Sequence, residues 1–172
     1  EEFTARLKKA VEDLIIGNGA KEGITVGPLI TERAATDVMS FIDDAVSKGA
    51  SVITGGKRSE HGECFIEPTI LTSVTNDMRV FQEGIFGPVA PLFSFKTEDE
   101  VLALANDTEH GLAAGIFTQN SARSLRMANS IRAGIVWVNT YRVVSPIAEF
   151  GGVKGSGYGR ESGFQAIYDY TR

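Results

Sequence analysis

Apolar residues recur at helical spacing in two stretches of the first half of the chain. The first covers residues 3–15 and predicts a helix that ends at the glycine-containing turn 17–19. The second covers residues 38–46 and predicts a helix with Thr31 as its N-cap and Gly49 as its left-handed end. Each helix is therefore expected to bury one face.

Short apolar runs predict extended segments between the helical patterns, at residues 51–54, 65–71, 89–95, 112–117 and 134–138. In the second half these runs alternate with helices that are predicted to begin with a capping box at Thr97 and a cap at Ser121. A β-α-β-α-β order with crossovers of this length indicates parallel strands. Near-continuous apolar strands indicate a sheet covered on both faces. We predict a three-layer αβα domain of the α/β class, with a largely parallel sheet, over residues 1–172.

Composition and charge narrow the classes of protein. The chain is 42% hydrophobic and 23% charged, which is typical of a globular domain and excludes a disordered tail or a coiled coil. The net charge of −5 argues against a partner with a phosphate backbone. No apolar run approaches the ~18 residues that span a bilayer. The single cysteine, Cys64, excludes an internal disulfide and favours a reducing compartment such as the cytoplasm.

Candidate reactive side chains are few and isolated. His61 and His110 have no metal-ligand spacing, and we interpret both as turn residues, so no metal site is predicted. Cys64 has no adjacent Lys or Arg to lower its pKa, and we interpret it as a partly buried small hydrophobe. The acidic run 98–100 occupies a predicted first helical turn, where the helix dipole favours negative charge.

A glycine-rich segment, residues 155–159, resembles a dinucleotide-binding loop only superficially. It lacks the G-x-G-x-x-G spacing after a strand, so we interpret it as an irregular loop. The flanking Lys154 and Arg160 remain candidates for binding an anion or a neighbouring carboxylate. These residue types alone suggest no reaction.

Several short motifs that occur in a fixed order and spacing are more informative about function than these single residues. They are Glu83–Val89, Phe150–Gly157, Gly159–Glu161, Gly27–Leu29, Glu67–Thr69, Ala105–Thr108 and Trp137–Asn139. In order and spacing the chain resembles the NAD(P)-dependent aldehyde dehydrogenase superfamily from Glu1 to Arg172.

The resemblance implies that the chain is most of a catalytic domain without its nucleophile. In the family, a cysteine thiolate attacks the aldehyde, hydride passes to the nicotinamide, and water hydrolyses the thioester. The resemblance places that cysteine, the general-base glutamate and most of the cofactor-binding domain upstream of Glu1. We therefore expect no catalytic residue in this chain, no activity from the chain alone, and an ordinary structural role for Cys64.

The resemblance also implies cofactor-binding positions for NAD or NADP. Phe86 is similar to the family's aromatic residue near the nicotinamide. The family has two glutamates before Ile-Phe-Gly-Pro, and the second holds the ribose hydroxyls. Here Glu83 is the first, and Gly84 stands at the second position. Loss of that hydrogen bond would weaken binding by about 1.5–3 kcal/mol, unless Glu83 swings in.

The resemblance also implies positions that contact the substrate. Phe150 resembles the aromatic residue that lines the aldehyde tunnel, and residues 141–149, beginning at Tyr141, correspond to the substrate-selecting loop. Glu149 stands where proline is common in the family. Arg142 prompts the hypothesis that the aldehyde carries a carboxylate, as a semialdehyde does. The alternative is a solvated arginine at the tunnel rim, or one that pairs between subunits.

The expected partners are an aldehyde, the missing cofactor-binding domain and further copies of the chain in a homo-oligomer. Neither nucleic acid nor a membrane is expected as a partner. An interpretation from another functional class stays open: the chain is a non-catalytic α/β oligomerisation or binding module derived from the same family.

Overall fold

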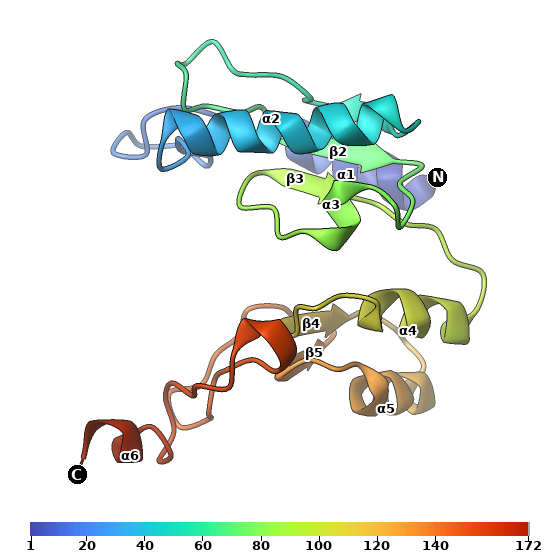
Figure 1. The fold of residues 1–172 in the computed structure, drawn as a ribbon, viewed down its shortest axis with the longest axis vertical. Coiled ribbons are helices and arrows are strands. Elements are labelled where there is room, and N and C mark those ends of the chain that lie inside the picture. Colours follow the sequence, from blue (N-terminus) through green and yellow to red (C-terminus); the bar gives the residue numbers. More distant parts are fainter. Residues whose placement is uncertain (172) are drawn as a thin grey trace. The chain divides into compact units, whose positions relative to one another are not determined.

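The computed structural model describes residues 1–171 and divides the chain into two compact units, Glu1–Ser94 and Phe95–Arg172 (Figure 1). The first unit holds α1 (Glu2–Glu12), α2 (Glu32–Ser47), β1 (Ser51–Thr54), β2 (Thr69–Thr72), α3 (Arg79–Gln82) and β3 (Val89–Pro91). Its sheet has the order β1-β2-β3, with β1 antiparallel and β3 parallel to the central strand β2.

Helix α2 provides more of the core of the first unit than any other element. Its buried side chains are Ala35, Val38, Phe41, Ile42 and Ala45, and they pack against residues that include Leu71 and Met78. The Thr31 hydroxyl accepts a hydrogen bond from the Ala34 amide at 3.1 Å, and Gly49 has a φ of 101°. The predicted N-cap and left-handed end of α2 are therefore both confirmed.

Helix α1 ends at Glu12, earlier than its apolar pattern predicted, and none of its residues is fully buried, so the expectation of a buried face was wrong for this helix. The following backbone pairs with residues 24–26 instead: the Ile15 amide donates to the Thr25 hydroxyl at 2.8 Å, and Ile16 forms a bridge with Val26. These contacts use the groups that a longer helix would need, so the prediction of a helix to residue 15 was wrong.

The second unit contains α4 (Glu98–Asn106), β4 (Ala113–Ile116), α5 (Ser121–Ser130), β5 (Ile135–Val138), a 3₁₀ turn (Lys154–Ser156) and α6 (Ile167–Tyr170). Strands β4 and β5 are parallel, with α5 as the connection between them. The mixed α/β class and the parallel crossover are thus confirmed. The apolar run 89–95 was predicted to open the β-α-β-α-β order, and this was wrong: it is shortened to β3, which pairs with β2 in a different sheet from β4 and β5.

Two local predictions for the second unit need correction. Asn120, not Ser121, caps α5, because its side-chain oxygen accepts from the Arg123 amide at 2.9 Å. Strands β4 and β5 are half-buried rather than covered on both faces, and Phe117 after β4 is 71% exposed. The predicted cap at Thr97 is confirmed by its 3.1 Å bond from the Glu100 amide.

No helix in residues 1–171 combines the length and the apolar character needed to cross a membrane.

Candidate functional site

The first candidate region lies in the first unit, beside α2 and α3. A pocket of about 300 Å³ is lined by Ala34, Asp37, Val38, Phe41, Arg79, Glu83, Gly84 and Phe86. All three residues that were predicted to contact the cofactor therefore line one pocket. The ring of Phe86 is 89% exposed, so an aromatic face is available to a planar group.

Of the two carboxylates that line this pocket, Asp37 and Glu83, Arg79 binds Glu83. Its Nε donates to Glu83 Oε1 at 2.7 Å and its Nη2 to Oε2 at 3.2 Å. Its guanidinium carbon also lies 4.3 Å from the centre of the Phe41 ring, a cation–π contact. The bond from Arg79 lowers the pKa of Glu83 and raises the pKa of Arg79. The pocket thus fits an aromatic ring, but its Glu83 carboxylate is already paired.

Asp44 fixes the start of α3 and with it the position of Arg79. Its Oδ2 accepts from the Arg79 amide at 2.9 Å, and its Oδ1 lies 3.0 Å from Lys48 Nζ. The hydrogen bond from the Arg79 backbone, followed by that from Lys48, lowers the pKa of Asp44. The carboxylate therefore joins α2 to α3, and the Arg79–Glu83 pair is built on that junction.

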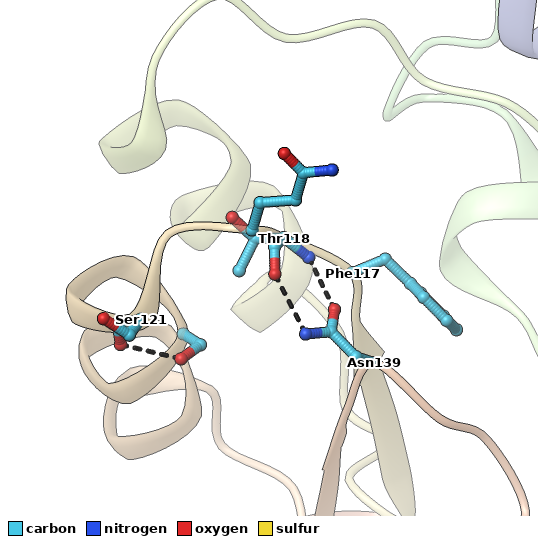
Figure 2. Close-up of a pocket in the computed structure, with 6 residues that line it drawn as sticks. Phe117, Thr118, Ser121 and Asn139 are labelled. Atoms are coloured by element: carbon cyan, nitrogen blue, oxygen red, sulfur yellow. Dashed lines mark hydrogen bonds between the residues drawn. The ribbon is translucent and has the colours of Figure 1, made fainter.

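The second candidate region lies at the carboxyl ends of the parallel strands β4 and β5, where α/β sheets commonly bind ligands. A pocket of about 610 Å³ is lined by Phe117, Thr118, Gln119, Ser121, Ser124 and Asn139 (Figure 2). The Asn139 side chain accepts from the Thr118 amide at 2.9 Å and donates to the Thr118 carbonyl at 2.9 Å. Asn139 has a φ of 54° and so turns the chain directly after β5.

The chemistry of this second pocket is limited to hydrogen bonding. None of its lining residues is an acid, a base or a thiol, and the Ser124 hydroxyl already donates to the Ser121 carbonyl at 2.7 Å. Figure 2 shows this bond on α5, apart from the Asn139–Thr118 pair. The pocket can receive a polar group, but its residues supply no proton-transfer step.

The predicted substrate residues belong to the segment that follows β5. The Tyr141 ring lies 5.1 Å from the Trp137 ring in an edge-on arrangement. Arg142 is exposed and has a φ of 60°, a left-handed conformation that costs about 1–3 kcal/mol for a residue other than glycine. Phe150 is half-buried and exchanges backbone hydrogen bonds of 2.7 and 2.8 Å with Glu161. The structure therefore anchors Tyr141 and Phe150 and leaves Arg142 in solvent.

The two cations of the glycine-rich segment bind backbone carbonyls. Lys154 Nζ donates to the carbonyls of Asn106 and Thr108, both at 3.1 Å, at the end of α4. Arg160 donates to the carbonyl of Gly152 at 2.8 Å, and also to those of Tyr158 and Gly159. The suggestion that these cations bind an anion or a carboxylate is therefore replaced by a structural role.

Gly134 and Gly151, which lie outside the glycine-rich segment, allow backbones to approach closely. A Cβ on Gly134, just before β5, would lie 1.8 Å from the Gly151 carbonyl oxygen, and one on Gly151 would lie 2.2 Å from that of Gly159. Within the glycine-rich segment, a Cβ on Gly155 would lie 2.9 Å from the Glu109 carbonyl oxygen, and the backbone forms only a short 3₁₀ turn, in agreement with its interpretation as an irregular loop.

Cys64 and the histidines take no part in either pocket. Cys64 is half-buried, and its carbonyl accepts from the Leu29 amide at 2.8 Å. His61 packs against Phe65, with ring centres 5.9 Å apart, and shares a 3.0 Å hydrogen bond with Ser59. Among residues 1–171, no group of three or more His, Cys, Asp or Glu side chains is placed to hold a metal ion.

Sequence reasoning missed Arg79 and the pocket around Asn139. The position of Arg79, four residues before Glu83, is a spacing that favours an ion pair on a helix and could have pointed to their contact. Asn139 directly follows a predicted parallel strand, and the rule that ligands bind at carboxyl ends could have pointed to it.

Comparison with known proteins decides the family. The pattern described as "Aldehyde dehydrogenase family" matches residues 1–172, the whole chain. The chain belongs to the aldehyde dehydrogenase family. Among its relatives, the mitochondrial succinate-semialdehyde dehydrogenase of Oryza sativa subsp. japonica is 48% identical over 99% of this chain and 32% of the relative. The NADP⁺ succinate-semialdehyde dehydrogenase of Escherichia coli K12 is 46% identical, over 99% of this chain and 35% of the relative.

Solved aldehyde dehydrogenases also share the fold. The structure of succinate-semialdehyde dehydrogenase from Burkholderia pseudomallei has a TM-score of 0.95 and 48% identity, covering 98% of this chain and 35% of that one. Betaine aldehyde dehydrogenase from Staphylococcus aureus, solved with NAD⁺, has a TM-score of 0.92 and 35% identity, covering 98% of this chain and 34% of that one. This chain therefore spans about a third of the length of the aldehyde dehydrogenases that it matches.

Proposed function

We propose that residues 1–172 form one part of the catalytic domain of an NAD(P)-dependent aldehyde dehydrogenase that oxidises an aldehyde to a carboxylic acid. The observation that carries the proposal is the meeting of Glu83, Gly84 and Phe86 at one pocket, within a chain that matches the family along its whole length. The two compact units would then belong to a single functional domain.

On the cofactor side, this chain offers the aromatic face of Phe86 at a pocket that the carboxylates of Asp37 and Glu83 also line. When bound, NAD or NADP supplies the hydride acceptor. The exposed Phe86 would pack against the nicotinamide ring, while Gly84 brings no carboxylate to the ribose. Because Arg79 pairs with Glu83, a swing of Glu83 toward the ribose would first have to break two hydrogen bonds. The cofactor is therefore expected to bind less tightly than in an enzyme that has glutamate at position 84.

On the substrate side, Phe150 and Tyr141 would line the path of the aldehyde and Arg142 would favour one that carries a carboxylate. Relatives named succinate-semialdehyde and glutarate-semialdehyde dehydrogenases support this choice. Arg142 supports it as well, since its exposed guanidinium can form paired hydrogen bonds with a carboxylate.

The reactive cysteine and the general base would come from chain that precedes Glu1 in the complete enzyme. The 172 residues alone are then expected to be inactive, with Cys64 in a structural role. We also propose that the enzyme acts in the cytoplasm as a homo-oligomer, without a nucleic acid or membrane partner.

The test compares the 172-residue chain with the complete enzyme that carries the upstream cysteine. Succinate semialdehyde is mixed with NAD or NADP, and formation of the reduced cofactor is followed by its absorbance. We expect turnover by the complete enzyme and none by the 172-residue chain. Turnover by the short chain that disappears in Cys64→Ser would overturn the assignment of Cys64. A complete enzyme that oxidises neither charged nor neutral aldehydes would favour the non-catalytic module.

A further inference from the structure

Gly115 and Trp137 stand opposite each other in the register of β4 and β5, and the chain after β5 folds back onto this pair. The Tyr141 ring lies where a side chain at position 115 would be. A Cβ on Gly115 would lie 2.9 Å from Tyr141 Cδ2 and 3.4 Å from Cε2. Contacts this short are not tolerated, so any larger residue at position 115 would displace the ring of Tyr141.

Trp137 holds the segment at the two residues that flank Arg142. Its ring meets the Tyr141 ring edge-on, with centres 5.1 Å apart and an angle of 71° between their planes. Its indole Nε1 donates to the Val143 carbonyl at 2.8 Å. Arg142, between them, has a φ of 60°. An arginine seldom keeps this backbone conformation unless its surroundings enforce it.

We propose that Gly115 and Trp137 are positioning residues that hold residues 141–143 and thereby orient Arg142 toward the substrate. Gly115 provides the space for the Tyr141 ring, and Trp137 fixes Tyr141 by ring contact and Val143 by a hydrogen bond. The effect on the substrate rests on the proposed function of Arg142. The hold on the segment does not, because it is a property of the 172-residue chain.

The hold can be measured in this chain by limited digestion with trypsin, which cuts after Arg142. Trp137→Phe keeps an aromatic ring and removes the donor to Val143. We expect cleavage after Arg142 to become about threefold to tenfold faster, the factor that an ordinary hydrogen bond represents. Cleavage after the exposed Lys57, in the other unit, is the internal reference and is expected to stay the same. An unchanged ratio of the two cleavage rates would overturn the proposal.

Gly115→Ala tests the space under Tyr141. Displacing the ring should expose Trp137, the only tryptophan of the chain, and shift its emission to longer wavelength. Gly19→Ala is the matched control, because a Cβ there meets nothing within 4 Å. Equal emission from Gly115→Ala and the parent would contradict the role of Gly115. If circular dichroism shows that Gly115→Ala does not fold, the cleavage result with Trp137→Phe decides the proposal.

The link to the substrate is tested in the complete enzyme with a carboxylated aldehyde and a neutral aldehyde of equal length. A positioning role predicts that Trp137→Phe, which keeps an aromatic ring beside Tyr141 and loses the bond to Val143, lowers kcat/KM more for the carboxylated aldehyde than for the neutral one. An equal loss for both would mean a structural role only and would overturn this link. If Arg142→Ala leaves the preference unchanged, the proposed selection by Arg142 fails, while the cleavage test still decides the hold on the segment.

Discussion

Arg79 binds both carboxylate oxygens of Glu83, at 2.7 and 3.2 Å, directly beside the residue that has no side chain, Gly84. The pair leaves this pocket with an exposed aromatic ring, Phe86, and a carboxylate that is already neutralised by its partner. The proposed cofactor site therefore offers an exposed aromatic ring, while Glu83 is already paired and Gly84 brings no acceptor for the ribose hydroxyls.

Restoring a carboxylate at position 84 should strengthen cofactor binding. Hydrogen bonds to a charged group contribute about 1.5–3 kcal/mol, so Gly84→Glu is expected to lower the Kd of the complete enzyme for NAD or NADP about tenfold or more. Calorimetric titration with each cofactor measures the change. Glu83→Gln is the control and is expected to change Kd little, because Arg79 holds that carboxylate. An unaltered Kd in Gly84→Glu would contradict the assignment of this pocket.

The stability of the first unit should decrease in acid. Hydrogen bonds from the Arg79 backbone and from Lys48 lower the pKa of Asp44 from its usual value of 3.8. The hydrogen bond from the Arg79 side chain lowers the pKa of Glu83 from its usual value of 4.5. The unfolded chain then binds protons more readily, so this stabilisation is present above those values and is lost as the pH falls through the lowered ones. The urea midpoint is expected to drop between about pH 5 and about pH 3.

Asp44→Asn should make that drop smaller, since asparagine cannot titrate. Urea unfolding followed by circular dichroism across this pH range measures it. Asp43→Asn, at the exposed neighbouring position, should keep the parent's pH dependence. The same flattening in both variants would argue against a specific contribution from Asp44.

Asn139 should stabilise the second unit through its two bonds to Thr118. Asn139→Ala is expected to lower the free energy of unfolding by about 1–3 kcal/mol, from two hydrogen bonds of ordinary strength. Asn139→Gly removes the same bonds and accepts the φ of 54° more readily, so it should lose less. Trp137 fluorescence in urea reports both. Gln119→Ala, at an exposed position of the same pocket, should be near neutral.

Arg142 should determine the preference for a carboxylated substrate. Arg142→Ala in the complete enzyme is expected to lower kcat/KM for succinate semialdehyde about threefold to tenfold, the range for one exposed, partly screened charge pair. The rate with a neutral aldehyde of equal length should be unaffected. Arg142→Lys should retain part of the preference, because it keeps the charge and loses the paired hydrogen bonds. If the ratio of kcat/KM for the carboxylated aldehyde to that for the neutral one is equal in the parent and in Arg142→Ala, Arg142 is a solvated residue without a role in selection.

The parts of the fold that depend on neighbours in the sequence were predictable. Thr31 caps α2 through an amide three residues away, and the stripe of α2 is buried as its spacing predicts. Errors arose where near-equal local signals compete: Asn120 replaces Ser121 as the cap of α5, one residue away. The end of α1 was wrong because distant residues, near Thr25, provide partners for its last backbone groups.

The candidate site was predictable only through the motif resemblance. Glu83, Gly84 and Phe86 are close in sequence, and they line one pocket as the resemblance implied. The Arg79–Glu83 pair joins residues four apart, whereas the hydrogen bond from the Arg79 amide to Asp44 joins residues that are far apart in sequence. The carbonyls that bind Lys154 and the Gly115 backbone beside Tyr141 are likewise distant in sequence, and no local spacing identifies them.

By itself, the sequence determined the buried stripe of α2, the caps at Thr31 and Thr97, the parallel crossover from β4 to β5, and the family. These follow from hydrophobic periodicity, from hydrogen bonds between residues a few positions apart, and from motifs in register. Only the tertiary structure decided that β3 pairs with β2, that Lys154 binds carbonyls at the end of α4, and that Gly115 accommodates Tyr141. Those outcomes depend on which surfaces, distant in sequence, meet in the folded chain. Local sequence patterns do not specify such contacts, and the close packing of the folded chain does.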